Sequence, residues 1–168
     1  MFRRLRIGFS GLALLVLCLS LALVGASPAR ADFQNTVDYT LTNQNGKDFS
    51  GQDLVNTSFA GAQGKAANFS GANLHGAILT QGAFPNADFS GADLSDALMD
   101  RVDMSGTDLR DAVLVGVIAS GATFNGAQVE NADFSDALLD RIDQRLLCQS
   151  ARGTNPKTGA DTRSSLGC

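Results

Sequence analysis

The sequence is poor in the residues that build an ordinary globular core. It has no Trp, one Tyr and three Pro, and aromatic residues make up 7% of its 168 residues, whereas Gly occurs 18 times. Such a composition argues against a conventional core of mixed large side chains. It indicates that some regular arrangement of the chain takes the place of that core.

Histidine is also scarce, since His75 is the only one. A lone His that follows an apolar position is more simply interpreted as a surface residue than as a general base. The sequence shows no nucleophile paired with a base and no cluster of metal ligands. Gly recurs at turns and precedes no helix, which argues against a phosphate-binding loop. We therefore expect neither enzyme activity nor a cofactor.

Basic residues gather only at the N-terminus, so no basic patch indicates nucleic-acid binding. Arg3, Arg4 and Arg6 precede an apolar stretch over residues 7–24, and Ala29-Arg30-Ala31 follows it. This order is typical of a secretory signal over residues 1–31. An uncleaved membrane anchor is the alternative. The apolar stretch is just long enough for this, since it lies at the short limit for a membrane span. Cleavage leaves 9 basic and 17 acidic residues, a net charge of −8, and no membrane attachment.

Two cysteines remain after that cleavage, Cys148 and Cys168. An even number of cysteines in an exported chain predicts a disulfide. The bridge would close a loop of about 20 residues and contribute about 3 kcal/mol in the chain-entropy model. The disulfide is either a permanent structural bond or a redox-regulated one.

An apolar residue recurs every five positions from Phe49 to Leu139, and we call these positions the repeat centres. Of the 19 centres, 17 are large and apolar, 12 have Ala two residues earlier, and 15 have Gly, Asn or Asp two residues later. A period of five matches neither a helix nor a strand. It predicts a chain that turns a corner after each short side, with a residue that tolerates positive φ at the corner, as at Pro85-Asn86.

Ala72-Asn73-Leu74, Ala87-Asp88-Phe89 and Ala92-Asp93-Leu94 resemble the A-(D/N)-L-x-x consensus of the pentapeptide-repeat family. The resemblance covers residues 47–141 and implies an all-β fold, a right-handed quadrilateral β-helix of about 4.75 coils. We expect residues 32–46 to form an N-terminal cap segment. Residues 142–168 should form a short helical cap, helix-like over 142–147, and a disulfide-closed tail. The small centres Gly64 and Ala119 should pack thinly, at about 1–3 kcal/mol each relative to Leu.

The residue before each centre should face outward, and on one of the four sides these residues are apolar. The candidate interaction face consists of Ile78, Leu98, Ile118 and Leu138, with Val113 on the adjoining side. Such a stripe on an acidic rod indicates an interaction with an unknown protein partner or a second copy, or coverage by the protein's own terminal segment. Columns of Asp elsewhere allow a divalent-cation site or mimicry of a charged polymer, although simple solvent-facing residues explain them better.

The tail, with Asn155-Pro156-Lys157-Thr158-Gly159 and Ser165-Leu166-Gly167-Cys168, resembles that of exported pentapeptide-repeat proteins of the cyanobacterial and chloroplast thylakoid lumen. This resemblance implies a location in the thylakoid lumen or periplasm. We expect a non-catalytic structural or protein-interaction module there. The alternative is a DNA-mimic topoisomerase inhibitor, as some family members are. B-DNA carries about 14 charges over the length of such a rod, however, whereas the whole chain after cleavage has a net charge of only −8.

Overall fold

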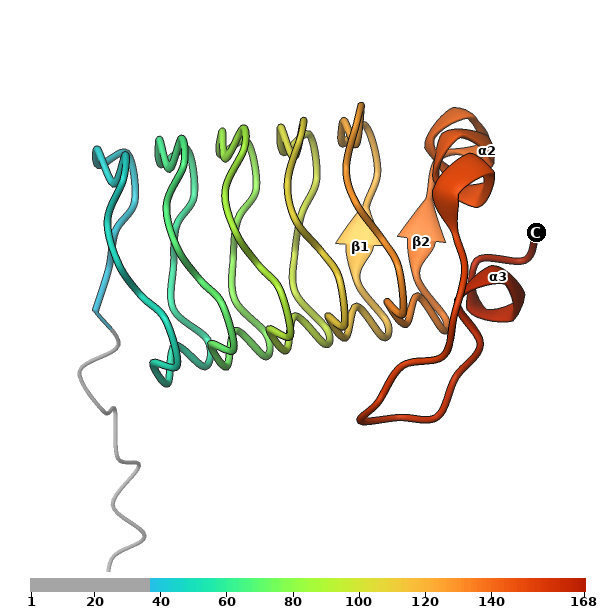
Figure 1. The fold of residues 1–168 in the computed structure, drawn as a ribbon. Helices are drawn as coiled ribbons and strands as arrows, with labels where there is room; N and C mark the ends of the chain where they lie inside the picture. Colours follow the sequence, from blue (N-terminus) through green and yellow to red (C-terminus); the bar gives the residue numbers. More distant parts are fainter. Residues whose placement is uncertain (1–36) are drawn as a thin grey trace, which may run out of the picture. The chain divides into compact units, whose positions relative to one another are not determined.

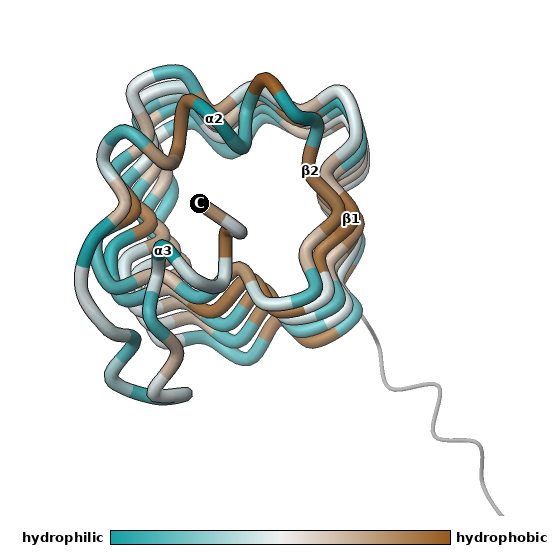
Figure 2. The backbone as a smooth tube through the Cα atoms, turned by 90° about the vertical axis from the view of Figure 1, so that its right-hand side faces the viewer, coloured by the Kyte–Doolittle hydropathy of each residue, from teal (hydrophilic) through white to brown (hydrophobic). Residues whose placement is uncertain are grey.

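The computed structural model describes residues 37–168; the predicted signal over residues 1–31 lies outside the described residues. The chain winds into a four-sided solenoid in which each residue lies beside the one 20 positions later (Figures 1 and 2). Parallel bridges between the coils run from Asp38↔Ser58 to Val113↔Asp133. The strands β1 (Ile118–Ala119) and β2 (Leu138–Leu139) continue the same parallel register.

The solenoid begins before residue 47, so the prediction of a separate cap segment over residues 32–46 is wrong for residues 38–46. Asn43 pairs with Gln63 in the regular register. The Tyr39 ring stacks on Phe59 at a centroid distance of 4.8 Å. Tyr39 and Gln44 therefore occupy repeat centres, and their divergence from the consensus hid them in the sequence.

The corners have the backbone conformation that the sequence predicts. At every corner between residues 41 and 136, the residue two positions after the centre has a positive φ, as at Asn86 with 59°. The N–H one residue further donates to the carbonyl of the centre, as from Ala92 to Phe89 at 3.0 Å. This is the geometry of a type II turn, which favours Gly or Asn.

The repeat centres and the Ala residues two positions earlier fill the interior. Phe69 stacks between Phe49 and Phe89 at centroid distances of 4.9 and 4.7 Å. The expectation of thin packing at Gly64 is wrong, because the Phe84 ring occupies that space. A Cβ added at Gly64 would lie 2.4 Å from Phe84 Cδ1. The Phe84 side chain thus fills the interior both at its own repeat centre and at Gly64, one coil earlier.

The C-terminal end of the solenoid carries helix α2 (Arg141–Ser150), in place of the helix expected over residues 142–147 (Figure 1). Leu147 packs into the core with 2% of its surface exposed. The disulfide between Cys148 and Cys168 joins α2 to the chain end, beside the short helix α3 (Thr162–Ser165). Within residues 37–168, no helix is both long and apolar enough to span a membrane.

Candidate interaction face

The solenoid side that contains β1 and β2 carries four stacked aliphatic residues, which we call the apolar ladder: Ile78, Leu98, Ile118 and Leu138. Each residue bridges to the next one along the ladder. Leu98, Ile118 and Leu138 are 37%, 36% and 59% exposed, and Ile78 is half-buried. The hydrophobic colour in Figure 2 marks this side at β1 and β2. Because the interior is already filled by the repeat centres, the fold itself does not require apolar residues here.

Helix α2 extends the apolar surface beyond the ladder, which the repeat pattern did not reveal. Only Asp140 separates β2 from α2, so Ile142 in the first helical turn lies close to the end of the ladder. Ile142 is 65% exposed, whereas Leu146, one turn later and 39% exposed, lines the cleft between α2 and the last coil. An apolar residue directly after the last repeat is the sequence signal that could have indicated this extension of the ladder.

Val113 does not belong to the exposed face, contrary to the sequence prediction. It is only 6% exposed. It lies on the adjoining side, in the column that continues to Asp133, which is also buried. Burial raises the pKa of Asp133, but hydrogen bonds from Ser135 and Thr158 outweigh this effect and lower it. Thr158 belongs to the C-terminal tail, so the tail covers this adjoining side.

The tail is held to the solenoid mainly through Asn155, which is 1% exposed. Its side-chain amide donates to the carbonyls of Ala112 and Asn131 at 3.0 and 2.9 Å. Its Oδ1 accepts from the backbone N–H of Lys157, whose ammonium in turn donates to the carbonyl of Gly91. The loop therefore runs back along the solenoid beside the adjoining side (Figure 1). In the described part of the chain, it leaves the apolar ladder uncovered.

We expect Asn155→Ala to lower the free energy of unfolding by about 2–3 kcal/mol, because it removes the donor to the Asn131 carbonyl and the acceptor of the Lys157 and Thr158 N–H groups. Differential scanning calorimetry measures this loss. Asn155→Asp should be at least as damaging, since a carboxylate cannot donate to that carbonyl. A substitution to Ala at the exposed neighbour Lys157 is the control and should cost much less. Equal melting of Asn155→Ala and wild type would show that the tail is not anchored here.

The corner that follows the apolar ladder contains unusual residues for its backbone conformation. Leu41, Gln81 and Arg101 occupy that corner in three of the coils, with φ of 57°, 59° and 54°, and Gly61 and Gly121 occupy it in two others. Left-handed backbone at such residues costs roughly 1–2 kcal/mol each. Outside this column, Ala66 is the other exception to Gly, Asn or Asp among the corners of the described residues. Strain that is retained at one margin of the ladder points to a role for these side chains.

The other margin of the ladder is acidic. Asp96 and Asp136 occupy its corners and are exposed. His75 is half-exposed, with its Nδ1 3.9 Å from Asp96 Oδ2. This contact places the histidine at the surface, as the sequence indicates.

The outward Asp columns have a local structural explanation. Asp88 and Asp93 each accept a hydrogen bond from the backbone N–H two residues later, at 2.8 and 3.0 Å. This is the Asx-turn geometry that favours Asp and Asn before a corner. Over residues 37–168, His, Cys, Asp and Glu form no group of three or more that could hold a metal ion.

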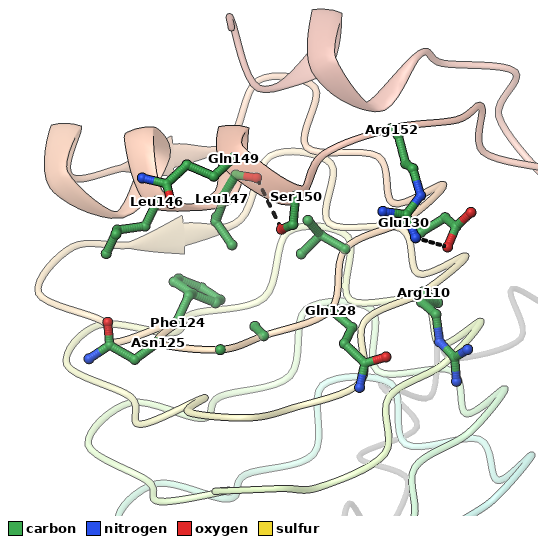
Figure 3. A pocket seen from close by; sticks show the side chains of 13 residues that line it. Arg110, Phe124, Asn125, Gln128, Glu130, Leu146, Leu147, Gln149, Ser150 and Arg152 are labelled. Carbon is green, nitrogen blue, oxygen red and sulfur yellow. Dashed lines mark hydrogen bonds and ion pairs between the residues drawn. The ribbon is translucent and has the colours of Figure 1, made fainter.

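A cleft of about 400 Å³ lies between α2 and the last coil, and the sequence did not reveal it because distant segments line it (Figure 3). Arg152 pairs with Glu130 at 2.9 Å on its rim. Arg110 hydrogen-bonds Asp108 and thereby lowers the pKa of that carboxyl group. Both guanidinium groups are thus already paired, and the lining residues include no nucleophile beside a general base.

The backbone edge in this cleft differs from the rest of the last coil. In the previous coil, Leu109 N–H donates to the carbonyl of Gln128 at 2.8 Å. The corresponding N–H of Val129 has no acceptor among residues 37–168, whereas Asn131 N–H finds Arg152 O and Phe134 N–H finds Ser165 Oγ. The Val129 N–H can therefore donate a hydrogen bond to a ligand in the cleft. The cleft is small, however, and its charged side chains are paired with one another. The apolar ladder is the stronger candidate for function.

Comparison with known proteins supports the repeat assignment. The family model described as "Pentapeptide repeats" matches residues 48–81, 83–116 and 97–136. A pentapeptide repeat protein from the Arabidopsis thaliana thylakoid lumen is 37% identical, with a TM-score of 0.74 over 75% of this chain and 88% of that one. No curated protein matches the chain.

Two further solved structures share the fold at lower identity. A pentapeptide repeat protein from Nostoc PCC 7120 is 21% identical, with a TM-score of 0.55 over 77% of this chain and 95% of that one. QnrB1, a plasmid-mediated fluoroquinolone resistance protein, is 18% identical, with a TM-score of 0.53 over 67% and 69%. These structures imply that the solenoid is a right-handed β-helix, as the sequence predicts.

Proposed function

The chain belongs to the pentapeptide-repeat family, and from this premise we propose that it is a non-catalytic protein-interaction module that binds through the apolar ladder. The observation that carries the proposal is the exposure of Leu98, Ile118 and Leu138 on one side only. Covering the four ladder residues contributes roughly 3–6 kcal/mol before the costs of association. The strained Arg101 corner beside the ladder supports a binding role for the same side.

We also propose that the protein works in the thylakoid lumen or the periplasm. The predicted signal over residues 1–31 supports export. The lumenal Arabidopsis protein, at 37% identity, supports the same compartment. A disulfide between Cys148 and Cys168 suits an oxidising location.

The alternative of a DNA-mimic topoisomerase inhibitor receives less support. The likeness to QnrB1 at 18% identity concerns the fold alone. A DNA mimic needs acidic residues over its faces, whereas one side of this solenoid is aliphatic and Arg101 and Arg141 border it. We therefore favour the interaction module.

The double variant Leu98→Ser/Ile118→Ser tests the proposal. We expect it to keep the melting temperature within a few degrees of wild type, because both side chains face outward, and to lose binding to proteins of the native compartment. Affinity capture from that compartment with the tagged mature protein, followed by quantitative mass spectrometry, measures the loss. Ala83→Ser, at the same outward position on another side, is the control and should retain every partner. Identical capture by wild type and double variant would contradict the proposal.

A further inference from the structure

We infer that the apolar ladder binds a second copy of this chain, with the two solenoids side by side and parallel. This inference rests on the proposed function, since it names the partner of the same face. Three features of the ladder support it: its spacing, the gradient of its exposure and the charges on its margins.

The spacing of the ladder favours a partner with the same repeat. Its residues are one coil apart, which is the strand spacing of about 4.8 Å. Each ladder residue pairs in register with the next, so the spacing is fixed by the backbone from Ile78 to Leu138. A second copy presents the same aliphatic residues at the same interval. All steps of the ladder can then be covered at once.

The gradient of exposure selects the parallel arrangement. Exposure along the ladder rises from the half-buried Ile78 to 59% at Leu138, with Ile142 beyond it at 65%, whereas the same outward column continues at the other end as Asp38 and Ser58, with exposed Leu41 at the adjoining corner. A twofold axis along the solenoid brings the most apolar end of each copy against itself. An antiparallel pair with full overlap would instead place Leu138 against the polar end, and desolvating that end would cost free energy.

The charges on the two margins are compatible with this axis. A twofold axis along the solenoid brings opposite margins together, so exposed Arg141 lies on the side of the exposed Asp136 of the second copy. Asp140, beside Arg141, already accepts a hydrogen bond from Gly121 N–H at 2.8 Å. In the antiparallel arrangement, each margin would face its own kind, so the acidic margin of one copy would lie along the acidic margin of the second.

The expected dimer is weak. The ladder from Ile78 to Leu138 spans three coil steps, about 15 Å. A face of that length and one side in width is smaller than the roughly 800 Å² per partner of a typical stable interface. Association should therefore depend on concentration.

Sedimentation equilibrium of the mature, oxidised protein tests the inference. We expect the average mass to rise from the monomer value towards twice that value between about 10 µM and about 1 mM. Leu98→Ser/Ile118→Ser should stay monomeric over this range, and Ala83→Ser should associate like wild type. A wild-type protein that remains monomeric at every concentration would overturn the inference. If that protein still captured other proteins through the ladder, the proposed function would stand without it.

Cross-linking tests the orientation of the two copies. In the parallel pair each ladder residue meets its own counterpart, so Leu98→Cys and Leu138→Cys should each form a covalent dimer on mild oxidation. Thr123→Cys, outward on another side, should not. In an antiparallel pair, no more than one ladder position meets its own counterpart. Failure of both ladder variants to cross-link would therefore refute the parallel arrangement.

Discussion

Leu94→Asp is expected to leave the mature protein unfolded at room temperature. Leu94 is a repeat centre of a middle coil with no exposed surface. A carboxylate there would be surrounded by the buried centres of the coils above and below, with no hydrogen-bonding partner. Burying such a charge costs several kcal/mol, which is comparable to the whole stability of a small domain. Far-ultraviolet circular dichroism and thermal melting measure the loss.

Asp93→Asn is the matched control for Leu94→Asp, because it changes the adjacent residue on the outer surface. Asp93 accepts hydrogen bonds from the N–H and hydroxyl groups of Ser95 through Oδ1, and Asn keeps that oxygen. Its effect should be within about 0.5 kcal/mol. Similar melting of the two variants would mean that the assignment of inward and outward positions is incorrect.

The repeat could be predicted from the sequence because each five-residue unit obeys the same local rules. A large centre, a small residue two positions earlier and a corner residue that tolerates positive φ recur without insertion, as from Ala92 to Asp96. These requirements are local, so they leave a visible period in the sequence. The disulfide between Cys148 and Cys168 could be predicted for a different reason, since cleavage of the predicted signal would leave those two cysteines and no other.

The features that the sequence did not reveal depend on contacts between distant residues. Val113 matches an exposed position by its place in the repeat, but the tail, anchored through Asn155, covers its side. The cleft under α2 likewise forms only when residues near Arg110, Phe124 and Ser150 come together. Nothing local in the repeat marks either one.

The apolar ladder is a case between these two. Its alignment follows from the 20-residue coil, so the residues could be named from the sequence. Their exposure could not, because it depends on where the tail lies. The tail runs along the adjoining side and leaves the side chains of Leu98 and Leu138 exposed to solvent. The apolar residues that the sequence pattern identifies are therefore accessible to a partner.

Gly64→Leu is expected to destabilise the protein by about 2–4 kcal/mol, although it restores the residue that the repeat favours at a centre. The position has no room for a side chain, since Phe84 Cδ1 and Cε1 lie 2.4 and 2.6 Å from a Cβ built at Gly64. Phe84 is itself fully buried and packs edge-on against Phe59 and Phe69, so its ring has nowhere to move. Chemical denaturation measures the change.

The double variant Gly64→Leu/Phe84→Ala separates this clash from other effects of the substitution. Phe84→Ala alone leaves a cavity and should cost about 3–5 kcal/mol. A Leu at residue 64 would fill part of that cavity, so the double variant should be more stable than the sum of the two single losses by about 2 kcal/mol or more. Additive losses would show that residues 64 and 84 do not share one space. A stabilising effect of Gly64→Leu alone would show that the repeat consensus, and not the packing of Phe84 across two coils, governs this part of the core.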